Sequence, residues 1–128
     1  MTIKEELRDD IAVLRITGQL MSGPEVQPFH QHIQRMILDG ITKVVVDFSK
    51  VKWFGSAMLG MMTASLASLR KEGGDLRLTG VMKKIESILM VTKLASIFQT
   101  LDSVDSAVAS FKPDKETVAR YGLPAEVT

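Results

Sequence analysis

Ser56 is the residue whose type and position offer the clearest chemistry in this sequence. It follows a glycine and precedes apolar residues at helical spacing, so the pattern predicts that Ser56 is the N-cap of a helix. Backbone N–H groups at that end of a helix lack intrahelical partners, and the helix dipole is positive there. The hydroxyl can therefore cap the helix, or it can be a phosphorylation site whose added charge the helix end tolerates. Residue type alone favours the cap.

The histidines, glycines and other residues that commonly form metal, nucleotide or catalytic sites show no pattern typical of such a site. His30 and His32 are two positions apart in a predicted helix and point about 200° apart, so they cannot share a metal ion. The sequence has no glycine-rich phosphate loop, and Ser56 lacks the G-x-S-x-G setting of an esterase nucleophile. The absence of cysteine excludes disulfides, thiolate metal sites and a cysteine nucleophile. We therefore expect a protein that is not an enzyme and that needs no metal or cofactor.

Two features lie between the preceding strand and Ser56. Asp47 ends a predicted buried strand, and Ser49 two residues later favours an Asx-type turn over a functional role for this carboxylate. Trp53 and Phe54 are expected to point one inward and one toward the rim of the Ser56 turn, because alternation forbids both on one face.

The helix after Ser56 has apolar residues on two faces. Its expected core stripe is Leu59, Met62, Leu66 and Leu69, and Met58, Met61, Ser65 and Ser68 fall on the other side. A partly exposed pair of methionines, Met58 and Met61, would form an adaptable protein-binding surface next to Ser56. The alternative is that another helix of the same domain covers them, and the pattern leaves both open.

The remaining chain supplies the framework that positions this helix. Strands and helices alternate after an initial hairpin, which predicts an α/β fold with a mixed sheet of four to five strands, about four helices and right-handed crossovers. The expected strands are 2–7, 11–17, 44–46, 75–79 and 97–101. The first expected helix starts at Pro24 after a Ser22 or Gly23 cap, and the second starts near Ser56. The third starts at Met82, and the last starts after Ser103 or Asp102. The apolar positions expected to face inward on the other helices are Val26, Phe29, Ile33, Met36 and Ile37, then Met82, Ile85 and Leu89, then Ala107, Val108 and Phe111.

Composition and charge restrict the class of protein. The 128 residues are 45% hydrophobic with a net charge of +1, which suits one globular domain. No basic cluster is longer than Lys83-Lys84, so nucleic-acid binding is not expected. The N-terminal residues are acidic where a secretory signal would be apolar, and no apolar run reaches spanning length. We expect a soluble, cytoplasmic protein without direct membrane insertion, with a domain over 1–111 and a tail over 112–128, either unpacked or forming a short helix over 114–121.

The order of elements and the motif around Ser56 resemble the STAS domain of the anti-sigma factor antagonist family over about Lys4–Phe111. Family members typically carry a strand ending in D-[LF]-S, a short apolar lead and then D-S-S-G-L-G. Here 47–49 reads Asp-Phe-Ser and 59–60 reads Leu-Gly, which match. The motif's Asp is replaced by Gly55, its second Ser by Ala57, its Gly by Met58, and the acidic residue of a G-x-L-D motif by Met21.

The resemblance implies a function and a set of site residues. It implies that Ser56 is the phosphorylated serine, and that the unphosphorylated protein binds an anti-sigma factor of the serine-kinase ATPase type, with a serine phosphatase resetting the cycle. The partner-binding residues would be Met21, Ser22, Trp53, Gly55, Ser56, Ala57, Met58, Met61 and Ser65. The alternative is a non-phosphorylated STAS scaffold in a signalling assembly, or an accessory subunit of a membrane transport ATPase. The oligomeric state stays open.

Overall fold

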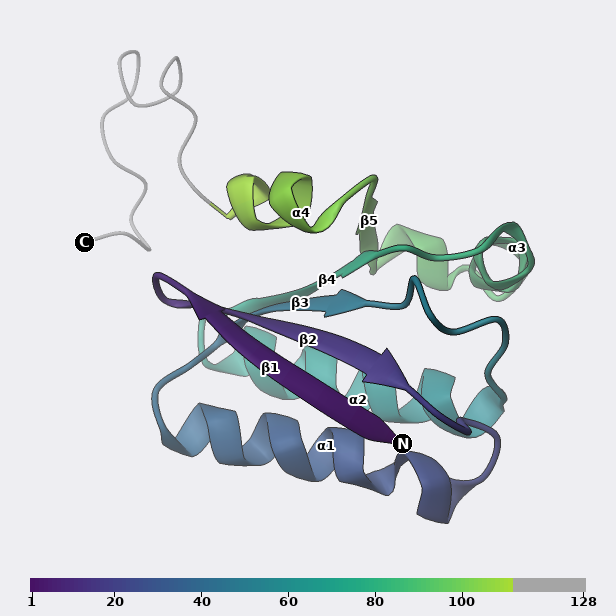
Figure 1. Cartoon of the computed structure of the whole chain (residues 1–128), viewed down its shortest axis with the longest axis horizontal. Coiled ribbons are helices and arrows are strands. Elements are labelled where there is room, and N and C mark those ends of the chain that lie inside the picture. Colours follow the sequence, from purple (N-terminus) through teal and green to yellow (C-terminus); the bar gives the residue numbers. More distant parts are fainter. Residues whose placement is uncertain (112–128) are drawn as a thin grey trace.

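A single mixed sheet forms the centre of the protein in a computed structural model that describes residues 1–111 (Figure 1). Its elements are β1 (Thr2–Arg8), β2 (Ile11–Thr17), α1 (Gly23–Leu38), β3 (Lys43–Asp47), α2 (Ser56–Lys71), β4 (Asp75–Thr79), α3 (Lys83–Val91), the 3-10 helix η1 (Leu94–Ser96), β5 (Gln99–Leu101) and α4 (Val104–Ser110). The predicted helix over 114–121 lies outside the described residues.

The sheet has five strands in the order β1-β2-β3-β4-β5. The hairpin strands β1 and β2 are antiparallel, and the pairs β2–β3, β3–β4 and β4–β5 are parallel. This confirms the predicted α/β fold, with its mixed sheet, N-terminal hairpin and four helices. The parallel arrangement brings the carboxyl ends of β2, β3 and β4 to one edge of the sheet.

Helices cover the two faces of the sheet unequally. Helices α1 and α2 lie side by side across one face, and the short helix α4 lies on the other (Figure 1). In β2, Ala12 and Leu14 belong to the large core on the α1–α2 side, whereas Ile11 and Val13 pack in a smaller cluster with Val108 of α4. The first four residues of β2 are therefore all buried, because both faces of a central strand are covered there.

Two predictions about the C-terminal third are wrong. The last strand begins at Gln99 rather than Ile97, because the 3-10 helix η1, closed by the Ile97 amide donating to the Leu94 carbonyl, carries Phe98 into the core before pairing with β4 starts. Met82 is exposed rather than inward-facing, because it is the N-cap of α3 and precedes its buried face. The other inward positions of that stripe, Ile85 and Leu89, are buried as predicted.

Candidate functional site

Ser56 is the first residue of α2 and not its N-cap, so that prediction is wrong. The N-cap is Gly55, whose backbone is extended and which provides no side-chain cap. Its carbonyl accepts the amide of Met58 at 3.1 Å. The Ser56 side chain is exposed, and its hydroxyl has no hydrogen-bond partner among residues 1–111. A free hydroxyl at the positive end of a 16-residue helix is available to an external group.

The loop before α1 contacts the start of α2. The amide of Gly55 donates to the carbonyl of Leu20 at 3.0 Å. A Cβ atom at position 55 would lie 2.8 Å from the carbonyl oxygen of Met21, closer than real Cβ contacts. Glycine is therefore needed at position 55 for the two loops to approach this closely, which accounts for its presence where the resemblance expects Asp.

The two loops present apolar side chains. Met21 is 50% exposed and Trp53 is 43% exposed, whereas Phe54 is buried with its ring centroid 5.5 Å from that of Phe48. The prediction that one of Trp53 and Phe54 points inward and the other outward is confirmed. Because the loops meet at Gly55, exposed apolar side chains from both belong to the surroundings of Ser56.

Of the two alternatives for Met58 and Met61, a partly exposed pair is wrong for Met58. Met58 is fully buried in the main core, and Met61 is only partly buried against it, as is Ala57. Ser65 is also fully buried, with its Oγ 3.1 Å from Nδ1 of His30 on α1. The alternative of cover by the same domain is therefore correct for Met58 and in part for Met61, and Ser65 is also covered.

The buried stripe of α2 differs from the predicted one at two positions: Met58 replaces Leu59 at its start, and Ser65 belongs to it. It consists of Met58, Met62, Ser65, Leu66 and Leu69, and Leu59 is only partly buried. Helix α2 carries apolar residues around much of its first two turns, so its own sequence does not decide which of them face the sheet. The contacts with α1 and the sheet decide it.

Ser22 has a structural role at the start of α1. Its hydroxyl accepts the amide of Glu25, and the Glu25 carboxylate accepts the amides of Ser22 at 2.9 Å and Met21 at 3.2 Å. This capping box confirms Ser22 as the predicted cap. The hydrogen bonds from Ser22 hold the pKa of the Glu25 carboxyl below its usual value, with a further contribution from the Met21 amide. They also fix the loop that carries Met21 beside Gly55.

The remaining polar residues singled out in the sequence are held within the fold. Asp47 Oδ1 accepts the amide of Ser49 at 2.9 Å, which confirms the predicted Asx-type turn. His32 Nε2 lies 2.7 Å from Glu5 Oε1 on β1, away from His30.

Residues 1–111 contain no group of three or more side chains arranged to hold a metal ion. Within the same residues, no helix is long and apolar enough to cross a membrane.

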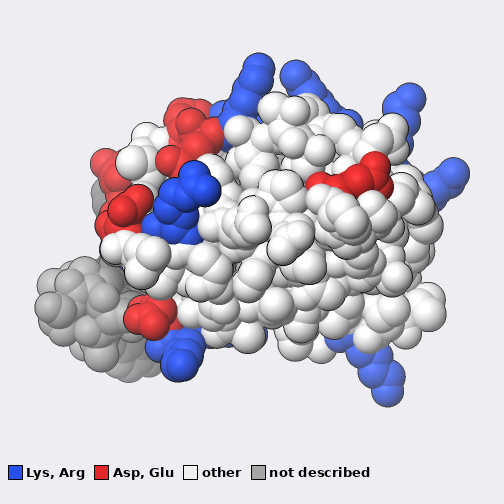
Figure 2. Space-filling view, turned by 90° about the horizontal axis from the view of Figure 1, so that it is seen from below, with Lys and Arg blue, Asp and Glu red and all other residues white. Residues whose placement is uncertain are grey.

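The face formed by α1 and α2 carries few charges. Figure 2 shows this face, with charged side chains mainly around its rim. The exposed positions of α2 between Ser56 and Arg70 are occupied by Gly60, Ala64 and Ala67. The surface that continues from Ser56 is therefore uncharged and made of small side chains, which suits contact with another protein better than contact with a charged ligand.

Comparison with known proteins places this geometry in a family. The model of the STAS domain matches residues 2–107. Among solved structures, the Thermotoga maritima protein TM1081 shares 23% identity, covers 84% of this chain and 92% of its own, and superposes with a TM-score of 0.78. An anti-sigma factor antagonist from Mycobacterium paratuberculosis shares 23% identity, covers 85% of this chain and 92% of its own, with a TM-score of 0.74.

The third similar structure is a phosphorylated protein. It is the Bacillus cell fate determinant SpoIIAA in its phosphorylated form, which shares 16% identity and covers 87% of this chain and 100% of its own, with a TM-score of 0.69. At these identities the structural likeness establishes a common fold.

Proposed function

The chain belongs to the STAS domain family, and we propose that it is an anti-sigma factor antagonist that is switched off by phosphorylation of Ser56. The observation that carries the proposal is the exposed Ser56 hydroxyl at the first position of α2, free of intramolecular hydrogen bonds within residues 1–111. The fold similarity to anti-sigma factor antagonists supports it. On this proposal the protein acts in the cytoplasm by binding and performs no reaction of its own.

The partner would be an anti-sigma factor of the serine-kinase ATPase type. The proposed docking surface consists of Met21, Trp53, Gly55, Ser56, Ala57 and Met61, which are exposed or partly buried. Met58 and Ser65, which the sequence placed among the partner-binding residues, are omitted because their side chains are fully buried. Ser22 is omitted because its hydroxyl caps α1. An unphosphorylated surface of this kind can pack against an apolar partner surface without burying an unpaired charge.

Phosphorylation would act locally. A phosphate adds about two negative charges at neutral pH. The amides and dipole at the start of α2 tolerate that charge, so the fold is retained. A partner surface packed against Met21 and Trp53 would instead have to desolvate the phosphate, and binding would be lost. A serine phosphatase would restore the binding form.

The test is affinity purification of the tagged protein from its native cell, in three forms. Wild type is compared with Ser56→Asp and with Ser103→Asp, and phosphate occupancy of Ser56 is read by mass spectrometry in the same samples. Ser103 is a matched control, because it also lies at a helix start but its hydroxyl caps α4 on the opposite face of the sheet. We expect an ATPase-type kinase to co-purify with wild type and with Ser103→Asp, and to be absent from the Ser56→Asp sample.

The opposite result has a definite meaning. If the same partners accompany all three forms and Ser56 is never phosphorylated, the switch is absent. The protein is then a STAS scaffold or an accessory subunit of a larger assembly, the alternative drawn from the sequence.

A further inference from the structure

The outer face of the sheet is only partly covered by α4. This seven-residue helix packs over Ile11, Val13 and Val45, near the amino ends of the parallel strands. The carboxyl ends of β2 and β3 extend beyond it and bear Arg15 and Asp47 on that face. In open α/β sheets, ligands bind preferentially at the carboxyl ends of the strands.

A pocket of about 200 Å³ lies at this uncovered edge. Strand register explains its composition: Lys4 of β1 is paired with Arg15 of β2, and Arg15 is paired with Asp47 of β3, so the three side chains form one row on one face. Thr17 lies two positions beyond Arg15 on the same face, and Ser49 and Lys50 of the following turn close the pocket.

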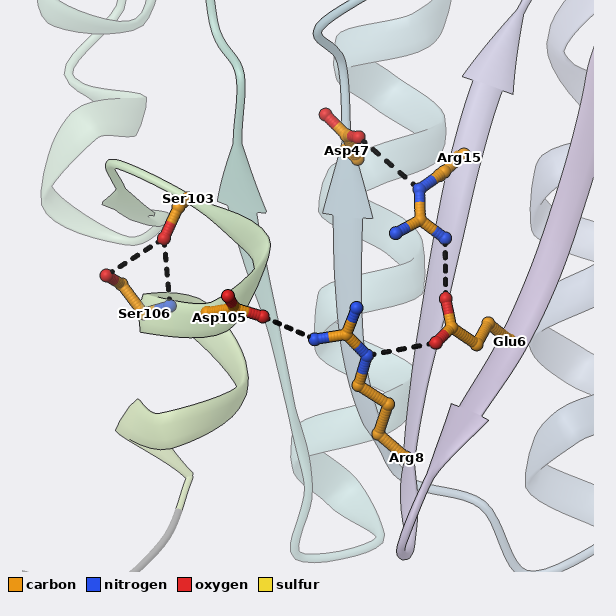
Figure 3. Close-up of polar contacts among 7 residues, drawn as sticks. All are labelled: Glu6, Arg8, Arg15, Asp47, Ser103, Asp105 and Ser106. Carbon is orange, nitrogen blue, oxygen red and sulfur yellow. Dashed lines mark hydrogen bonds and ion pairs between the residues drawn. The ribbon is translucent and has the colours of Figure 1, made fainter.

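The acidic groups near the pocket are already paired. The Arg15 guanidinium lies between two carboxylates, with Nη1 2.7 Å from Glu6 Oε2 and Nε 3.8 Å from Asp47 Oδ2 (Figure 3). Asp47 Oδ1 accepts the Ser49 amide. Hydrogen bonds from Arg15 and Arg8 hold the pKa of the Glu6 carboxyl below its usual value, so it stays ionised and keeps Arg15 oriented.

Two lysines of the lining remain unpaired. Neither Lys4 nor Lys50 has an ion pair or a side-chain hydrogen bond with any residue from 1 to 111, and both are exposed at the mouth of the pocket. The lining thus carries three cationic side chains against one carboxylate. It also offers the hydroxyls of Thr17 and Ser49, which can donate hydrogen bonds to an anion.

We propose that this pocket binds a small anion bearing a phosphate group, with the ammonium groups of Lys4 and Lys50 as its principal charge partners. The hydroxyls of Thr17 and Ser49 supply neutral donors. The volume lies below the range of about 300–1,000 Å³ typical of sites for drug-sized ligands, so the ligand is inorganic phosphate or a short phosphate ester. Asp47 adds one negative charge to the lining, which the three cationic side chains outweigh.

The site is joined to the surroundings of Ser56 through the backbone. The chain passes from Thr17 to the loop that contains Leu20, and from Lys50 to the loop that ends at Gly55. These two loops are hydrogen-bonded to each other. The binding proposal itself does not depend on the function of Ser56, so either can fail alone.

The test is titration of the ¹⁵N-labelled full-length protein with inorganic phosphate at constant ionic strength, followed by amide chemical shifts. We expect saturable shifts of Thr17, Ser49 and Lys50, and at least a tenfold weaker dissociation constant in Lys4→Ala/Lys50→Ala. Lys52→Ala is the matched control, since Lys52 is an exposed lysine two residues away and outside the pocket. All three substituted lysines are exposed, and the spectra report whether each variant remains folded.

Three results overturn the proposal. One is the absence of saturable shifts at these amides, and another is equal weakening by Lys52→Ala. The third is binding at the start of α2, seen as shifts of the Ala57 and Met58 amides that survive the double substitution.

Glycerol 3-phosphate as a second probe separates the two sources of the phosphate group. Tighter binding than inorganic phosphate supports an ester as the ligand, and equal or weaker binding supports the free ion.

Discussion

The amide of Gly55 donates a hydrogen bond to the carbonyl of Leu20 at 3.0 Å, which joins the loop before α1 to the first turn of α2. This contact brings the backbone of Met21 beside Gly55, the residue that precedes Ser56. The local order at Ser56 therefore depends on two loops from separate parts of the chain.

Removal of the Ser56 hydroxyl should hardly change stability. Ser56→Ala should alter the free energy of unfolding by less than about 0.5 kcal/mol, because the hydroxyl makes no hydrogen bond within residues 1–111. Ser22→Ala should cost about 1 kcal/mol, because it removes a capping box. Urea denaturation of both variants measures the difference. Equal losses would mean that Ser56 caps α2 in solution.

A side chain at position 55 should separate the two loops. Gly55→Ala should destabilise the protein by about 1–3 kcal/mol, because its Cβ would lie 2.8 Å from the Met21 carbonyl oxygen. Gly60→Ala, inside α2, is the control: nothing lies within 4 Å of a Cβ at position 60, so alanine should stabilise by about 0.5–1 kcal/mol. Chemical denaturation gives both values. The prediction fails if the two substitutions change stability in the same direction.

Substitutions of Met58 and Met21 should have opposite effects, because Met58 lies in the core and Met21 lies on the proposed docking surface. Met58→Ala should cost about 2–5 kcal/mol in unfolding free energy, because the side chain is fully buried. Met21→Ala should change stability by less than about 0.5 kcal/mol and weaken the partner complex, because the side chain is 50% exposed. Thermal unfolding and pull-down of the same variants check both. If Met58→Ala is as stable as wild type but no longer binds the partner, Met58 is an interface residue and the prediction is wrong.

The capping box should contribute a pH-dependent part of the stability. The pKa of Glu25 is lower in the folded protein than in the unfolded chain, so its stabilising effect is fully present above the pKa of the unfolded chain and is lost as the pH falls through the folded pKa. Glu25→Gln keeps a hydrogen-bond acceptor at this position but does not titrate. Urea unfolding from pH 7 to pH 2.5 should show the largest difference between wild type and Glu25→Gln near neutrality. A difference that stays constant across this range would contradict the assignment.

Much of the fold could be predicted from local patterns. The strands Ile11–Thr17 and Asp75–Thr79 have the predicted bounds, and the first hairpin strand ends one residue later than predicted, at Arg8. Ser22 as the cap of α1 and the Asx-type turn at Asp47 also followed from residue types at fixed spacings. The cap and the turn depend on hydrogen bonds between residues fewer than five positions apart, and the strands follow from local apolar patterns, so the sequence displays all of them directly.

The buried face of α2 and the composition of the outer pocket were decided only by the tertiary structure. Met58, Leu59, Met61 and Met62 are all apolar, so the hydrophobic pattern of α2 admits more than one inward face, and packing on α1 and the sheet selects the one with Met58. Lys4, Arg15 and Lys50 lie far apart in sequence and meet through strand register and the turn after β3. The sequence by itself determined the elements and their order, because these follow from local periodicity and caps. Which side chains meet across those elements depends on packing and pairing between distant segments, and only the folded chain specifies it.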